Sequence, residues 1–230
     1  AKMARVFAGG ARMVVRPELG IRSLKQLKDR KVGVARGGAQ ELLLLAELAQ
    51  AGLTWSDRPG KDVQVMYLPF PDLNQALMQK QIDAMCQSEP YSSLALRRGF
   101  GVELMKPYDT PLGTPVRALV MTEKLYRERR DVAQRVLNCF VEATQKFIND
   151  PKFAVAYVRD QMFKGQITAE ECQDALGNSA FTCDITTEHM QVLTDLMARY
   201  GVGRMARPPK ATDWVKLDLL AQAKKQLKVK

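Results

Sequence analysis

The carboxylate of Glu89 has a position in the sequence that suits ligand binding. The stretch QIDAMCQSEPYS (81–92) joins an apolar, strand-like run at 82–86 to Glu89 and Pro90. Just past the end of a buried strand, the Glu89 carboxylate would accept hydrogen bonds from an amine or amide of a ligand. Pro90 also suits the first position of a helix, where the helix dipole favours a nearby acid. Two interpretations of Glu89 therefore stay open, a ligand-reading acid and a helix-start acid.

A second candidate lies in the stretch ARGGAQ (35–40). Gly37 and Gly38 permit unusual backbone angles and a close approach of the backbone to a ligand. They precede a helical pattern at 40–52, whose first N–H groups and dipole attract an anion or a strongly polar group. The chemistry would be an anion cradle, and the alternative is a simple glycine turn. The members of this cradle are Gly37, Gly38, Ala39 and Gln40. Neither G-K-[ST] nor G-x-G-x-x-G occurs here, so no nucleotide is implied.

Both candidates depend on the elements that precede them. Strand-like runs alternate with helical runs, at 31–35, 62–68 and 82–86 for the strands and 40–52 and 71–81 for the helices. This alternation predicts an α/β fold with a mostly parallel sheet, right-handed crossovers and helices on both faces. Ligands of such sheets lie outside the carboxyl ends of the strands. We therefore expect the three strands side by side in one sheet, with Glu89 and the 35–40 loop at the same edge.

Beyond residue 100 the pattern changes to two strand-like runs and then helices. The expected strands are 101–105 and 114–122, and the expected helices are 123–129, 131–149, 151–163, 168–176, 187–200 and 213–226. Thr168 with Glu171, and Ser23 with Gln26, have the spacing of capping boxes. Apolar residues at helical spacing in 131–149 predict the face of that helix that packs in the core. These residues are Val132, Val136, Cys139, Phe140, Ala143 and Phe147.

The overall composition limits the possible functions. Of the 230 residues, 46% are hydrophobic and 26% charged, which is typical of a globular protein. A net charge of +10 favours acidic partners. The basic residues are scattered through helical stretches such as 123–135 without interleaved aromatic residues, so we do not expect nucleic-acid binding. No apolar run has the roughly 18 residues of a membrane-spanning helix.

Cysteine and histidine usage argues against a metal site. The four cysteines show no C-x-x-C spacing, and His189 is the only histidine, so a Cys/His zinc site is not expected. We interpret the cysteines as single buried thiols. A disulfide between Cys172 and Cys183 is the alternative, and an oxidising compartment would permit it.

Taken together, these segments resemble a known family. The order of the segments 21–34, 37–40, 76–84 and Glu89–Pro90 is similar to that of the nitrate/sulfonate/taurine-type substrate-binding proteins of ABC transporters. That group includes binders of pyrimidine precursors of thiamin. The likeness covers most of residues 10–150. The sequence departs from the family pattern at Gln26, at Asp29 and Arg30, and at 79–81, where a glycine is common.

The resemblance implies a periplasmic binding protein-like architecture of type II, in which two α/β lobes are joined by two crossing strands and hold a ligand between them. Residues 1–17 would be a remnant of the first lobe with the first crossing at 12–17. Residues 18–113 would form the second lobe, and 114–230 the return crossing, at 114–120, and the helical part of the first lobe. Family members carry a segment before the strand-like MARVFAGG, so we expect an incomplete first lobe, with apolar surface uncovered or covered by a second chain.

The resemblance also implies a function and adds site residues. The chain would be the solute-binding component of an ABC transporter, periplasmic or else extracytoplasmic and lipid-anchored. It would deliver a small polar or anionic organic molecule (a sulfonate, nitrate or a pyrimidine-like compound) to a membrane permease. Tyr91 would stack on or cap this ligand, Arg117 would add positive charge, and Gly9 and Gly10 would face the cleft from the first lobe. No catalytic residue, metal or cofactor is expected.

Two other functions stay open. An enzyme that makes the thiamin pyrimidine resembles these binders, but it depends on an active-site histidine and cofactor chemistry, whereas His189 lies in the helical tail. A sensor module, in which a membrane partner reads the closure of the lobes, is compatible with the same composition. Turnover would indicate the enzyme, and a cleft that binds no small molecule would indicate the sensor.

Overall fold

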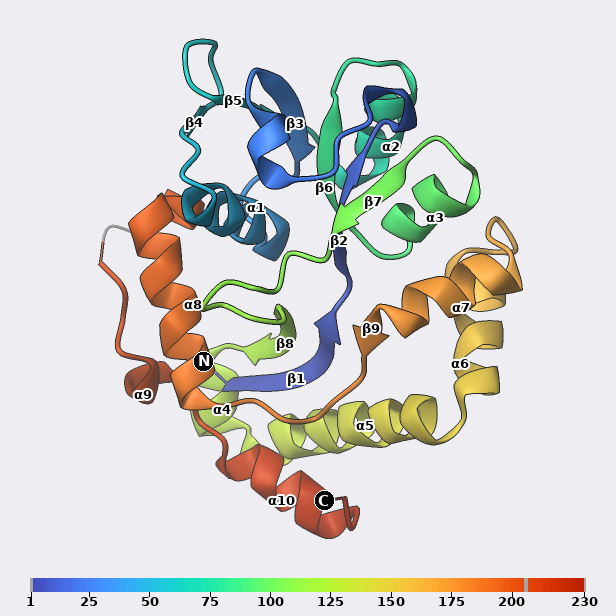
Figure 1. The fold of residues 1–230 in the computed structure, drawn as a ribbon. Helices are drawn as coiled ribbons and strands as arrows, with labels where there is room; N and C mark the ends of the chain where they lie inside the picture. The colour runs from blue at the N-terminus through green and yellow to red at the C-terminus, as the bar shows by residue number, and fades with distance from the viewer. Residues whose placement is uncertain (1, 205–206, 230) are drawn as a thin grey trace.

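Two β-sheets organise the chain, as the computed structural model shows for residues 2–204 and 207–229 (Figure 1). One sheet has the strand order β4-β5-β3-β6-β2-β7 and the other the order β8-β1-β9. The strands of the first sheet are β2 (Ala11–Val15), β3 (Arg30–Val34), β4 (Trp55–Ser56), β5 (Val63–Tyr67), β6 (Ala84–Ser88) and β7 (Val102–Met105). Those of the second are β1 (Lys2–Gly9), β8 (Val116–Met121) and β9 (Ser179–Ala180). We call the parts built on these sheets the larger lobe and the smaller lobe.

The three strands predicted to be neighbours lie together at the centre of the larger sheet. β3 pairs in parallel with β5 on one side, where Val32 opposes Val65, and with β6 on the other, where Val32 opposes Ala84. The prediction is confirmed. Because β3 and β6 are parallel neighbours, the two candidate loops that follow them lie at the same edge of the sheet.

Helices cover both faces of the larger sheet because its strands have apolar residues on both sides. On β2, Met13 and Val15 pack with the helix α1 (Ala39–Gln50), whereas Val14 between them faces α2 (Phe70–Met78) and α3 (Tyr91–Arg97). Successive side chains of a strand point to opposite faces, so one apolar strand supplies both layers of the core.

The smaller lobe is mainly helical. Its sheet is antiparallel, with β1 paired along its length to β8. Its helices are α4 (Glu123–Glu128), α5 (Arg130–Asn149), α6 (Pro151–Tyr157), α7 (Ala169–Gly177), α9 (Ala211–Trp214) and α10 (Asp218–Gln226). Helix α8 (Thr187–Tyr200) belongs to both lobes, because Met190 packs in the core of the smaller lobe and Leu196 in that of the larger one. Both capping boxes predicted from the sequence are present, at Thr168 with Glu171 and at Ser23 with Gln26. None of the described helices is long and apolar enough to cross a membrane.

Three details of the helical region differ from expectation. The predicted helix 213–226 is two helices, because the chain is extended at Val215. The predicted helix 151–163 ends in a π-helical turn, Val158–Met162. Most of the apolar stripe predicted to be the core face of α5 is on its outer side: Val136 and Phe140 are exposed, Leu137 and Val141 enter the core instead, and only Phe147 of the stripe reaches the cavity. Helix α5 carries two apolar stripes, and spacing alone does not tell which one is covered.

The chain passes between the lobes at two places. The first passage is at Gly9 and Gly10, because β2 pairs with β6 on one edge and β7 on the other and so lies wholly within the larger sheet. The expectation of a crossing at 12–17 is therefore wrong. The second passage is 106–115, and the Tyr108 hydroxyl in it accepts a hydrogen bond from Ala11 N and donates one to Ala11 O, each at 3.0 Å. The two passages are thus tied together.

Gly9 has a special role in this passage, which a substitution tests. Its φ is +89°, and a Cβ built there would lie 2.8 Å from the backbone oxygen of Asn178. Gly20 also has a left-handed φ, of +60°, but open space around it. We expect Gly20→Ala to lower the free energy of unfolding by about 1–2 kcal/mol through backbone strain alone. Gly9→Ala should cost about 1–3 kcal/mol more, because the clash is with backbone that has to move.

Urea denaturation of both variants measures this difference. Equal losses for Gly9→Ala and Gly20→Ala would show that the passage tolerates a side chain.

Candidate ligand-binding cleft

A cavity of about 820 Å³ lies between the two lobes. The larger lobe lines it with residues 38–40, Phe70 and 88–91, and the smaller lobe with Arg117, Phe147 and several residues between 158 and 181. This volume is typical of a site for a small organic molecule. It lies at the carboxyl ends of β3 and β6, where a parallel sheet places its ligands.

Six of the nine site residues predicted from the sequence line this cavity. They are Gly38, Ala39, Gln40, Glu89, Tyr91 and Arg117. The other three lie elsewhere: Gly37 precedes the lining segment, and Gly9 and Gly10 form the passage between the lobes. Gly9 N donates to Pro115 O at 2.9 Å and Gly10 N to Asn178 O at 3.0 Å, so their N–H groups are already used within the protein.

The start of α1 supplies donors to the cavity. Gly38 is the N-cap residue, in extended conformation, and no side chain caps the helix there. The N–H groups of the first turn, which have no partner within a helix, therefore begin at the cavity wall. Gly37, which precedes the N-cap, does not add a donor to them, because its N–H donates to the Glu41 carboxylate. The cradle predicted at 37–40 is accordingly narrowed to residues 38–40.

Glu89 is held by the protein itself. A cis peptide bond joins it to Pro90. Its Oε2 accepts hydrogen bonds from Ser93 N (3.0 Å) and Ser93 Oγ (2.7 Å), inside the first turn of α3. Its Oε1 accepts one from Asn178 Nδ2 (2.8 Å) and lies 3.3 Å from Arg12 Nε. With the side chain only 3% exposed and both oxygens engaged, this geometry favours the helix-start interpretation of Glu89 over the ligand-reading one.

Arg12 is the centre of a buried polar cluster that joins the lobes. Its side chain is 4% exposed, and its Nη1 donates to Ser93 Oγ and to Asp174 Oδ2 of α7, both at 3.0 Å. Its Nε lies 3.0 Å from Glu103 on β7. Burial alone would raise the pKa of Asp174, but hydrogen bonds to Arg12 and Ser93 outweigh it and lower the pKa. The acid therefore stays ionised opposite the guanidinium.

A second contact between α3 and α7 lies beside this cluster. Arg98 Nε donates to Glu171 Oε1 at 2.8 Å, and this hydrogen bond lowers the pKa of Glu171 although burial opposes it. The Arg98 side chain is half exposed, so this pair is screened by solvent and adds less than the buried cluster. Helix α7 is thus fixed to the larger lobe at two points.

Arg117 brings positive charge from the smaller lobe. It lies on β8 opposite Phe7 of β1, and its side chain is accessible from the open cavity. The surrounding walls desolvate the guanidinium and lower its pKa, but an arginine remains protonated at neutral pH. Arg117 and Glu89 are the charged residues that line the cavity, and the carboxylate of Glu89 lies 3.3 Å from the Arg12 guanidinium. Arg117 is therefore the cation of the cavity lining.

Several functional residues have no clear signal in the sequence. Arg12 has a weak one, since it is a lone charge inside the apolar strand ARMVV. Asp174 lies on α7, a helix of ordinary amphipathic pattern, and Asn178 is the residue that follows its end. The aromatic wall residues Phe147, Phe163 and Phe181 come from separate segments that only the tertiary fold brings together.

The thiols and acids of the described residues form no metal site or disulfide. No cluster of three or more potential ligands occurs among them. All four cysteines are free, and the predicted Cys172–Cys183 alternative is wrong because the two side chains pack in different apolar clusters. Cys139 is exposed, contrary to the expectation of buried thiols. Cys172 lines the cavity, and burial raises the pKa of its thiol, which makes it a poor nucleophile.

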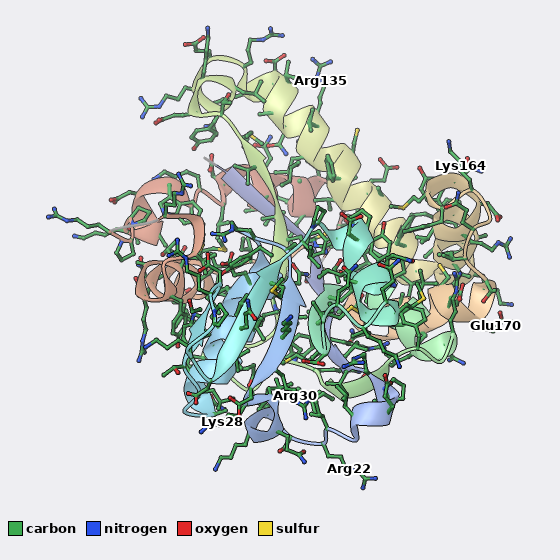
Figure 2. All side chains as sticks on the ribbon, turned by 90° about the horizontal axis from the view of Figure 1, so that it is seen from above. Arg22, Lys28, Arg30, Arg135, Lys164 and Glu170 are labelled. Carbon is green, nitrogen blue, oxygen red and sulfur yellow. The ribbon has the colours of Figure 1, made fainter. Side chains whose placement is uncertain are left out.

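The basic side chains labelled in Figure 2 lie at more than one end of the molecule. Arg22, Lys28 and Arg30 are at one end, and Arg135 and Lys164 are toward the other. This agrees with their interpretation as solvated surface residues.

Comparison with known families decides the relationship. The model of the NMT1-like family matches residues 9–159, more than half of the chain. The chain belongs to the NMT1-like family. This NMT1-like chain is 37% identical over 86 residues to an aliphatic sulfonates-binding protein of Escherichia coli (strain K12). That match covers 37% of the chain and 25% of the relative, so the alignment spans a quarter of that protein's length.

Solved structures confirm the fold of the NMT1-like chain. The periplasmic aliphatic sulphonate-binding protein of Escherichia coli superposes with a TM-score of 0.72 at 20% identity, covering 93% of this chain and 69% of that one. The desulfurization enzyme DSZB superposes with a TM-score of 0.65 at 14% identity, covering 97% and 80%. These identities show a shared fold, the two-lobed binding-protein fold expected from the sequence.

The Glu89 geometry makes a prediction that separates its two interpretations. In Glu89→Gln the NH₂ group of the new amide faces a hydrogen-bond donor whichever way the amide is turned. Arg12 also loses a buried negative partner. We expect the free energy of unfolding to fall by about 1–3 kcal/mol. Glu103→Gln is the matched control, since Glu103 also faces Arg12 but is 35% exposed, and it should cost at most about 1 kcal/mol.

Chemical denaturation of the two variants gives the answer. A Glu89→Gln variant of unchanged stability and altered ligand affinity would restore the ligand-reading interpretation.

Proposed function

We propose that the chain is the solute-binding component of an ABC importer and captures an organic anion in the cleft between its lobes. The observation that carries this proposal is a cavity walled by both lobes, with groups that attract an anion on each wall. The uncapped start of α1 comes from one lobe and Arg117 from the other. An anion that touches both would be held between them and favour closure of the lobes.

The relatives support this proposal. Membership of the NMT1-like family and similarity to sulfonate-binding proteins fit a site that needs directed donors and a concave wall, without a nucleophile. The permease of the importer would then be the membrane partner, and the chain would act outside the cytoplasmic membrane. The net charge of +10 also raises the local concentration of anions around the protein.

An enzyme is the second candidate because the desulfurization enzyme shares the fold, and a further structure of it contains biphenyl-2-sulfinic acid. The cavity lining speaks against it. Its thiol, Cys172, is protonated by burial, and its carboxylate, Glu89, is fully engaged. We expect biphenyl-2-sulfinate to stay intact on incubation with the protein. Release of sulfite, from hydrolysis of the C–S bond, would instead support the enzyme.

The binding proposal is tested by replacing Arg117. Calorimetric titration with ethanesulfonate, acetate, nitrate and ethylamine should give binding of the organic anions and none of the amine. Arg117→Gln should weaken anion binding by about tenfold or more, because hydrogen bonds to charged groups contribute about 1.5–3 kcal/mol.

Arg22→Gln is the control, since it removes the same charge from an exposed residue that does not line the cavity. It should leave the affinity within about twofold, because solvent screens a distant charge. Failure of every anion to bind, or equal effects of Arg117→Gln and Arg22→Gln, would contradict the proposal.

A further inference from the structure

The cavity is much larger and more apolar than a small anion requires. Its volume of about 820 Å³ is in the range of sites that enclose drug-sized organic molecules. Most of its lining residues are apolar or aromatic. An inorganic anion or a short alkyl sulfonate would leave this wall in contact with water.

Aromatic rings from both lobes make up much of that wall. Five rings line the cavity, and each is half-buried, with part of its surface in the cavity. They are Phe70, Tyr91, Phe147, Phe163 and Phe181. The first two belong to the larger lobe and the other three to the smaller one, so the wall is complete only when the lobes face each other.

The rings are fixed in place by contacts among themselves. Phe147 and Phe181 meet edge to face, with centroids 5.3 Å apart and an angle of 88°. Tyr91 of α3 and Phe163 of the smaller lobe meet in the same manner at 6.4 Å and 77°. Phe147 is held from behind by Phe153, at 5.8 Å, and Phe153 does not line the cavity. Rings arranged in this way present edges and faces that a further ring can meet in offset or T-shaped geometry.

We propose that the ligand is an aryl anion: a sulfonate or carboxylate head on an aromatic body of one or two rings. This inference rests on the proposed function and narrows it to a ligand class. The head lies at residues 38–40 and Arg117, and the rings of the body lie against the aromatic wall. A cationic head is excluded because the carboxylate of Glu89 is already compensated by Arg12 and Asn178.

Three sulfonates that share a head group and differ in body test the ligand class. In calorimetric titrations, naphthalene-2-sulfonate should bind about tenfold or more tightly than ethanesulfonate, and about threefold or more tightly than cyclohexanesulfonate. The comparison with cyclohexanesulfonate separates aromatic contact from buried apolar area. Equal affinities of the three sulfonates would overturn the aryl class and leave the proposed function standing. Absence of binding by all three would overturn the proposed function itself.

A pair of variants tests the wall. Phe181→Leu should lower the ratio of naphthalene-2-sulfonate to ethanesulfonate affinity by about threefold or more, because it removes a ring that lines the cavity. Phe153→Leu removes a ring of the same cluster behind the wall and should leave the ratio unchanged. Phe163→Leu serves as a second lining variant if Phe181→Leu fails to fold. The same ratio in a folded lining variant and in Phe153→Leu would contradict the proposal.

Discussion

The guanidinium of Arg12 holds the two lobes in register behind the cleft. Because this guanidinium is buried, its charge needs carboxylates in direct contact. These carboxylates come from the loop after β6, from β7 and from α7. Removal of any one of these segments would take away one of the carboxylates around the buried guanidinium. The position of α7, and with it the wall that α7 and its neighbours give the cavity, therefore depends on this cluster.

The same cluster decides the electrostatics of the site. Glu89 lies at the carboxyl end of β6, where a ligand-binding acid would also lie, but Ser93, Asn178 and Arg12 occupy both its oxygens. The cavity is left with the start of α1 and with Arg117 as its directed polar groups. Of the two loops that the parallel sheet places at one edge, the loop after β6 connects the lobes and the loop before α1 lines the cavity.

Local chemistry accounts for what the sequence could predict. The β-α-β-α-β alternation, the neighbouring strands β3, β5 and β6, the two capping boxes and the glycine turn before α1 each depend on residues close together in the chain. The location of 38–40, Tyr91 and Arg117 at one cavity follows from the parallel-sheet rule together with the family resemblance.

Long-range packing accounts for what the sequence could not predict. The exposed stripe of Val136 and Phe140 looks identical to a core stripe until the partner of α5 is known. The family resemblance places the first crossing at 12–17, and only the pairing of this strand with β6 and β7 shows that it belongs to the larger sheet. No glycine or proline within 211–226 marks the break at Val215.

The most direct test of the central claim is a measurement of where an anion binds on the folded protein. In a titration of ¹⁵N-labelled protein with benzenesulfonate, the backbone amides of Gly38, Ala39 and Gln40 should shift together, saturate at one dissociation constant and match the calorimetric value. The amides around Gly37 should shift less, because the N–H of that residue is held by Glu41. Shifts that never saturate, or that centre on other surfaces such as the outer face of α5, would contradict a binding site between the lobes.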